Sequence, residues 1–146
     1  MSTHTLAQGT RSSAVLALGT LASATYVCSS AIDLGAAIPI DVTFEVEANA
    51  NGTTSGNKQL VLFAKFSLDN TNWGTGPESG TTATEEADLH FLGVLPMVDT
   101  NDHRKFFSLL GQPTARYLKL VAKNDMGVAL SSGNVYKADI TAVTTA

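Results

Sequence analysis

Apolar and polar residues alternate along several stretches of this chain, and the clearest alternation runs from Ile38 to Ala48. A period of two places every second side chain on the same face of a β-strand. The pattern therefore predicts a half-buried strand with a wet, acidic outer face. Its expected inward residues are Ile40, Val42, Phe44 and Val46, and its expected outward residues are Asp41, Thr43, Glu45 and Glu47.

A second alternating stretch, from Lys58 to Leu68, is apolar on both faces in its first half. Two apolar faces are typical of a strand in the middle of a sheet. The residues Asp69 to Asn72 follow, and their short side chains can bond to their own backbone, which predicts a turn. The apolar positions are Leu60, Leu62, Ala64, Phe66 and Leu68 on one face and Val61 and Phe63 on the other.

The remaining strands are expected to be short and closely spaced, and no segment has a helical period. This spacing is typical of sandwiches and barrels. We therefore expect an all-β fold, an antiparallel two-sheet β-sandwich, with a jelly roll favoured over an immunoglobulin-like arrangement. An extended N-terminal arm, 1–13, would precede a single domain, 14–146. Further strands are expected at 14–18, 23–28, 89–98, 103–110, 115–123, 128–130 and 135–143, with turns at 99–102 and 131–134.

The composition is unusually poor in charge. Of the 146 residues, 44% are hydrophobic but only 15% are charged, against about 25% in a typical globular protein. The net charge is −4 with no Lys/Arg cluster, so we expect no nucleic-acid partner. No apolar run approaches the roughly 20 residues of a membrane span. Arg11 and the apolar run after it imitate a signal peptide, but one positive residue in thirteen is too few to predict one.

Candidate catalytic and metal-binding residues lack the spacings that such sites need. Cys28 is the single cysteine, which excludes a disulfide framework and a cysteine zinc site, and we expect it to pack as a small apolar residue. The three histidines have no H-x-H or H-E-x-x-H spacing. Asp99 to Asp102 lacks the glycine and the following glutamate of a calcium loop, and no G-x-S-x-G elbow is present. We therefore predict no enzyme, no metal and no cofactor. The histidines are His4, His90 and His103.

Two polar segments are the candidate contact surfaces. One is the arm, 1–13, and the other is the stretch from Gly74 to Asp88, which has no hydrophobic period and is longer than most structureless loops in compact domains. Trp73 precedes it, and packing in a core or interface is favoured over a sugar-stacking platform. The candidate partner-binding residues are Thr3, His4, Leu6, Arg11, Trp73, Pro77, Glu78, Thr81 and Thr82.

Four stretches together resemble small virion structural proteins of tailed bacteriophages, of the capsid decoration or cement kind. They are turn-and-strand patterns rather than catalytic motifs, and they cover about a third of the chain. Proteins of this kind include β-sandwiches and jelly rolls that sit on the capsid surface as dimers or trimers. The stretches are Leu21 to Leu34, Phe66 to Gly80, Leu89 to Leu95 and Lys119 to Val135.

The resemblance implies a non-enzymatic protein, made in the host cytoplasm, that binds the outside of an assembled capsid. It would clamp neighbouring major capsid proteins as a homo-oligomer, with residues 1–13 as the arm and Gly74 to Asp88 as a contact loop. A tail or head–tail joining component and a carbohydrate-binding sandwich module remain as alternatives. A protein that binds only the assembled shell stabilises it by mass action.

Overall fold

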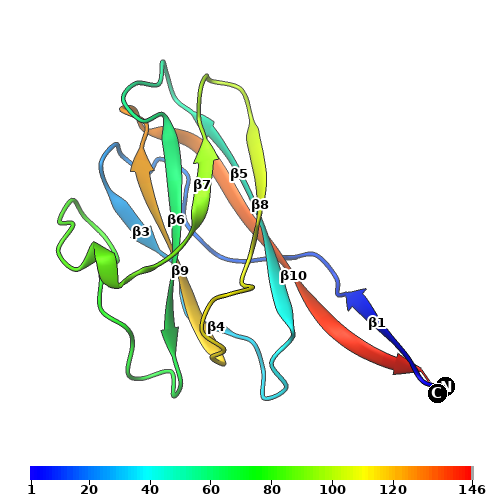
Figure 1. Ribbon diagram of the computed structural model, residues 1–146. Helices are drawn as coiled ribbons and strands as arrows, with labels where there is room; N and C mark the ends of the chain where they lie inside the picture. Colours follow the sequence, from blue (N-terminus) through cyan, green and yellow to red (C-terminus); the bar gives the residue numbers. More distant parts are fainter. Residues whose placement is uncertain (146) are drawn as a thin grey trace.

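The computed structural model of this protein describes residues 1–145. These residues form ten β-strands and one short 3-10 helix, folded as two antiparallel sheets that pack face to face (Figure 1). The predicted all-β sandwich is confirmed. The elements are β1 Thr3–Gln8, β2 Ser12–Ser13, β3 Tyr26–Cys28, β4 Ile32–Asp33, β5 Asp41–Ala50, β6 Gln59–Ser67, η1 Glu86–Asp88, β7 His90–Pro96, β8 His103–Ser108, β9 Tyr117–Asp125 and β10 Leu130–Thr145.

The strand order is that of a jelly roll. Sheet A has the order β1-β10-β5-β8, with β2 also paired to β10, and sheet B has the order β3-β9-β6-β7, with β4 also paired to β9. β2 can be taken as a continuation of β1, and β4 as a continuation of β3, which leaves eight strands. The first of these, β1, then lies beside the last, β10, in sheet A. The second lies beside the second-to-last in sheet B, which is the double Greek-key arrangement.

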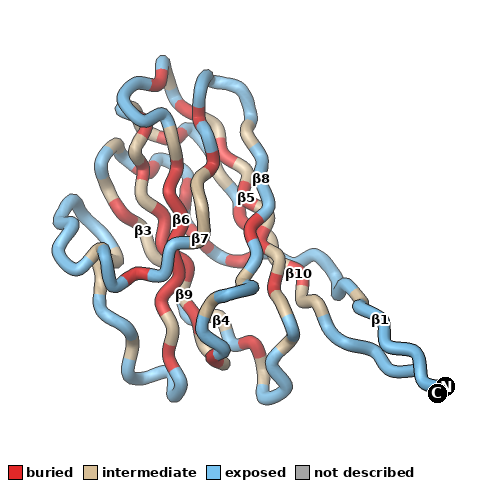
Figure 2. The backbone as a smooth tube through the Cα atoms, viewed as in Figure 1, coloured by how far each residue is buried: buried red, intermediate tan, exposed pale blue. Residues whose placement is uncertain are grey.

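The main core lies between the two sheets, and it follows the predicted alternation. Buried and partly exposed residues alternate along the whole of β5, and Val42, Phe44 and Val46 are each 1% exposed. The central place predicted for the 58–68 strand is confirmed, because β6 pairs with β9 on one side and β7 on the other. Figure 2 shows the buried backbone concentrated between the sheets. Ile40 departs from the pattern and is 53% exposed, because β5 begins one residue after it.

Several expectations drawn from the sequence are wrong. Leu68, which the alternation groups with Leu60 and Leu62, is 81% exposed, because β6 ends at Ser67. The strand expected at 128–130 begins only at Leu130. Residues 14–18 form no strand. They run irregularly along sheet A, where the Ala14 N–H donates to Val135 O and Leu16 and Leu18 are buried. The segment 131–134 is not a turn but part of β10, which pairs with β5 and has an irregularity between Leu130 and Ser132. Gly133 allows Leu18 to pack closely against β10, since a Cβ atom at position 133 would lie 2.6 Å from the Leu18 Cβ.

The N-terminal segment pairs with the end of the chain. β1 runs antiparallel to the last part of β10, from Thr3 opposite Thr145 to Gln8 opposite Ile140. Residues 1–13, predicted as an extended arm, are thus extended and paired with β10 through β1 and β2. The pair formed by Thr3–Gln8 and Ile140–Thr145, called here the terminal ribbon, projects from the sandwich and has the Thr3–Thr145 pair at its tip (Figure 1).

Candidate interaction surfaces

The terminal ribbon has two unpaired edges. On the body of the sandwich, β10 lies between β5 and the N-terminal strands, but its pairing with β5 ends at Ile140 opposite Asp41. Beyond that point, Thr141–Thr145 has β1 on one side and no strand of the described chain on the other. The outer edge of β1 is likewise unpaired. The backbone groups at these edges are therefore open to another strand.

The ribbon carries none of the features that usually protect an open edge. It holds no Asp, Glu, Lys, Arg or Pro, and its pairing runs in one continuous register from Thr3 to Gln8. Leu6 is 67% exposed and Val143 41% exposed. Two of the other edges are protected, because β8 carries Arg104 and Lys105, and β7 ends in a proline and has a bulge against β6. Charges, prolines and bulges are the usual means of preventing strand addition.

Arg11 fixes the base of the ribbon to the outer face of sheet A. Its guanidinium donates two hydrogen bonds of 3.0 Å to the Glu45 carboxylate and lies 3.4 Å from the centre of the Tyr136 ring. The hydrogen bond from Arg11 lowers the pKa of Glu45, and the same bond raises the pKa of Arg11. Paired carboxylate and guanidinium groups of this geometry give orientation as well as energy.

The outer face of sheet A is otherwise open. Arg104 forms ion pairs with both Glu45, at 3.3 Å, and Glu47. Phe106, opposite Glu45 in the sheet, is 62% exposed. A shallow hollow of about 140 Å³ lies beside Phe106 and Tyr136. Its charged groups are already paired with one another, so this face offers little net charge to a partner.

The end of the sandwich from which the ribbon projects is apolar. Its loops expose four large aliphatic side chains, and three of them, Ile38, Ile40 and Leu110, line a hollow of about 150 Å³. The four residues are Ile38, Ile40, Leu68 and Leu110.

The predicted contact loop between β6 and β7 folds back over the outer face of sheet B. Under it lies a second apolar cluster, separate from the main core. The backbone of β3 holds the loop, since the Tyr26 N–H donates to Gly80 O at 2.9 Å. Gly76 has a φ of 123°, and a Cβ atom there would lie 2.6 Å from Leu89. The cluster consists of Tyr26, Val61, Phe63, Leu89 and Val121.

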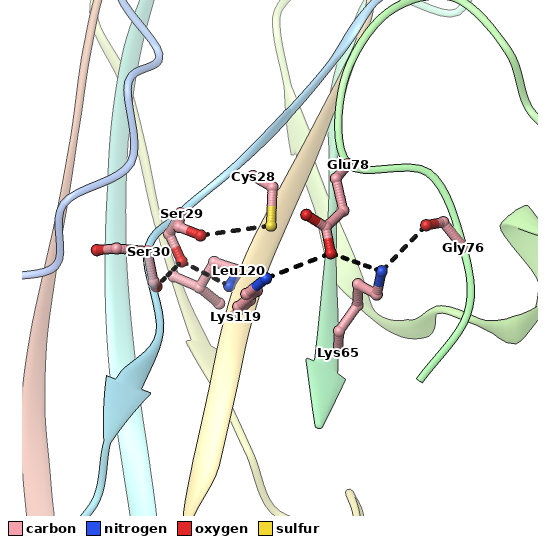
Figure 3. Close-up of polar contacts among 8 residues, drawn as sticks. All are labelled: Cys28, Ser29, Ser30, Lys65, Gly76, Glu78, Lys119 and Leu120. Carbon is pink, nitrogen blue, oxygen red and sulfur yellow. Dashed lines mark hydrogen bonds and ion pairs between the residues drawn. The ribbon is translucent and has the colours of Figure 1, made fainter. Parts of the chain in front are cut away.

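A buried lysine holds this loop in place (Figure 3). Lys65, on β6, is only 5% exposed, and its ammonium donates to Glu78 at 2.8 Å and to Gly76 O at 3.1 Å. Lys119 approaches the same Glu78 oxygen at 3.4 Å. The hydrogen bond from Lys65 is the main reason that the pKa of Glu78 is lowered. Glu78 was a candidate contact residue, and here its carboxylate is engaged within the chain.

The sequence contained a signal for this arrangement. Lys65 is the one charged residue within the stretch LVLFAKF, which is apolar on both faces. A charge placed in a central strand has to find a partner, because burying it unpaired is very costly. The long acidic segment that follows was the natural source of that partner, but no spacing rule says which carboxylate it would be.

A second ion pair holds the loop further along the chain. Glu86, in η1, accepts hydrogen bonds from Lys123 at 2.8 Å and from the Tyr26 hydroxyl. Cys28, beside this region, is partly buried, and burial raises the pKa of its thiol to about 11. A thiol with so high a pKa is a poor nucleophile at neutral pH.

The structure places the candidate partner-binding residues on two separate surfaces. Thr3, His4 and Leu6 lie on the exposed ribbon, with His4 Nδ1 3.0 Å from the Thr144 hydroxyl. Arg11 lies at the base of the ribbon, against Glu45 and Tyr136 of sheet A. The others lie on or near the loop over sheet B. There, Trp73 is half-buried under the Lys119 ammonium, which is 4.6 Å from its ring centre. Among the rest of that group, Pro77 is half-buried, and Thr81 and Thr82 are exposed.

The other histidines have local partners. His90 packs edge-on against Phe66, with 5.1 Å between ring centres, and His103 lies 3.0 Å from Asp99. Within residues 1–145, no group of three or more His, Cys, Asp or Glu side chains is gathered as metal ligands would be. The same residues include no helix that is long and apolar enough to cross a membrane. No protein-family model matches this chain, and no curated protein matches it.

Proposed function

We propose that this protein is a non-enzymatic virion structural protein that binds the outside of an assembled phage capsid. It would stabilise the shell by bridging neighbouring major capsid proteins. The observation that carries this proposal is the terminal ribbon, an uncharged, exposed two-stranded element that leaves its outer edge unpaired. An isolated ribbon of this kind is marginal in water and gains stability from a partner.

The outer edge of β1 fits a partner that offers a strand. Because the Gly9 N–H donates to Asp139 O, the odd residues of β10 point their backbone groups toward β1. Alternation along an antiparallel pair then leaves the N–H groups of His4, Leu6 and Gln8 pointing outward. Addition of a strand to such an edge gives affinity through main-chain hydrogen bonds. The jelly-roll fold agrees with a virion role, although it hosts lectins and other functions as well.

The first test is the copy number of this chain in purified virions, measured by mass spectrometry against the major capsid protein. A ratio near one to one, or a simple fraction of it, supports the proposal. A few copies per particle would instead place the protein in the tail or at the head–tail joint. Absence from every particle overturns the virion role, and glycan binding lost on Trp73→Ala would then identify a carbohydrate-binding module.

The second test blocks the β1 edge. Leu6→Pro removes an N–H that points away from β10, so the hydrogen bonds between β1 and β10 remain. Proline is tolerated in an edge strand where the N–H faces solvent. Leu6→Val, which keeps the N–H, is the matched control. Co-sedimentation with capsids should fall at least about tenfold for Leu6→Pro, the loss of about 1.4 kcal/mol, and should be unchanged for Leu6→Val. Equal binding of the two variants excludes β1 as the capsid contact.

A further inference from the structure

The unpaired edge of β10 has a definite hydrogen-bonding pattern. The N–H groups of Gly9 and Ala14 donate to the carbonyls of Asp139 and Val135, so the odd residues of β10 point toward the N-terminal strands. Backbone groups of successive residues alternate in direction along a strand. Ala142 and Thr144 therefore point their N–H and C=O groups into the open space beyond the end of β5.

This open space is a notch that continues the line of β5. β5 begins at Asp41, opposite Ile140, and the residues before it turn away into the apolar end of the sandwich, where Ile38 and Ile40 are exposed. A strand lying along Thr141–Thr145 would satisfy the free backbone groups and pass beside those aliphatic side chains. The notch is thus bordered on one side by a strand edge and at its end by apolar surface.

We propose that a second copy of this chain fills the notch, so that two ribbons pair through β10 into a four-stranded sheet of order β1-β10-β10-β1. In an antiparallel pair with Val143 on the two-fold axis, Ala142 of one copy lies opposite Thr144 of the other. Ala142 and Thr144 are the two residues whose N–H and C=O groups point outward. In this register, the N–H and C=O groups of both residues in both copies form hydrogen bonds. A two-fold contact of this kind is self-complementary.

The charge distribution of the ribbon permits a second copy at this edge. Each chain has a net charge of −4, and like charges placed directly opposite each other across a strand pair are destabilising. The ribbon contains no acidic or basic side chain other than His4, so two copies can meet there without such a contact. The ribbon is about 17 Å long at about 3.3 Å per residue, which places its tip beside the apolar end of the other copy and keeps the bodies apart.

This contact is separate from the proposed capsid contact. It uses the β10 edge and leaves both β1 edges free at the margins of the four-stranded sheet. A dimer would then present two capsid-binding edges, and two linked contacts bind more tightly than either alone. The interface itself is short, so the dimer is expected to be weak and dependent on concentration.

The experiment is a measurement of molar mass by light scattering during size-exclusion chromatography, at about 5 to 500 µM protein. The natural chain should shift from monomer to dimer over this range. Val143→Glu and Val143→Lys each place like charges on the two-fold axis and should weaken the dimer about tenfold. An equal mixture of the two variants should recover dimerisation, as mixed pairs of opposite charge. Val98→Glu, at an exposed residue on the opposite end of the sandwich, is the charge-matched control and should dimerise normally.

A second variant tests the hydrogen bonds directly. Ala142→Pro removes one N–H from the free edge and should leave a monomer, whereas Ala142→Val should dimerise. Thermal unfolding like that of the natural chain shows that each variant is folded. A natural chain that stays monomeric at about 500 µM overturns the proposal, as does a Val143→Glu variant that dimerises like the natural chain. Because capsids are absent from this experiment, its result is independent of the proposed virion role.

Discussion

The outer faces of the two sheets are built in opposite ways. Over sheet B, the loop between β6 and β7 covers Val61, Phe63 and Val121, and the ion pair of Lys65 with Glu78 holds it there. On sheet A, Phe106 stays exposed, and the ion pairs of Glu45 lie among water-accessible arginines. On sheet B, the ion pair of Lys65 with Glu78 holds a loop over apolar side chains. On sheet A, the ion pairs of Glu45 lie on the surface, and no loop covers them. A partner is therefore expected on the side of sheet A and its ribbon.

The largest expected difference between the faces lies in two phenylalanines. Phe63→Ala removes a side chain that is 7% exposed and packs edge-on against Phe91, so it should lower the free energy of unfolding by about 3–5 kcal/mol. Phe106→Ala, on the open face, should change it by no more than about 0.5 kcal/mol. Urea denaturation followed by tryptophan fluorescence measures both. Equal losses would mean that sheet A is covered as fully as sheet B.

The two central carboxylates give a smaller contrast. Glu78→Ala leaves the buried Lys65 ammonium with only the Gly76 carbonyl, and the loss should be about 1–2 kcal/mol, limited because Glu78 itself is partly exposed. Glu45→Ala frees two arginines that water can already solvate, so its urea midpoint should shift less. A larger shift for Glu45→Ala would show that the sheet A ion pairs, and not the loop, hold the sandwich together.

The pH dependence of stability gives the smallest effect. The pKa of Glu78 is lowered from its ordinary value of 4.5, chiefly by Lys65. A carboxylate with a lowered folded pKa stabilises the fold above its unfolded pKa, and this contribution is lost as the pH falls through the folded value. The difference in unfolding free energy between the natural chain and Glu78→Gln should therefore be constant above pH 5 and shrink below about pH 4.5. A difference that grows toward low pH would contradict this role of Glu78.

The fold was predictable because the alternation in the central strands is strong. Val42, Phe44 and Val46 point inward as the pattern requires, and the Asp69 carboxylate accepts the N–H groups of Thr71 and Asn72, which gives the predicted turn. The same hydrogen bonds, that of Asn72 first, lower the pKa of Asp69. Local chemistry and burial here favour the same structure.

The errors arose where a distant contact decided the local structure. Ser131 to Asn134 has the composition of a turn, but pairing with β5 makes it a strand, and its glycine serves the close approach of Leu18. The candidate contact residues were also divided by tertiary structure. Glu78 is a candidate contact residue because its loop has no hydrophobic period, yet the loop folds onto sheet B, where Glu78 pairs with Lys65. No short-range pattern encodes either contact.

The pairing of Thr3 with Thr145 also sets an order of events during folding. Contacts between the two ends of a chain are the slowest to form, because the whole intervening chain must be closed into a loop first. On the ribosome, β1 is made before β10, so β1 has no partner until β10 has been made. Where many chains are made close together, a β1 that is still unpaired can pair with the β10 of another chain. Crowded synthesis therefore favours exchange of β1 between copies, whereas refolding at high dilution favours the closed ribbon within one chain.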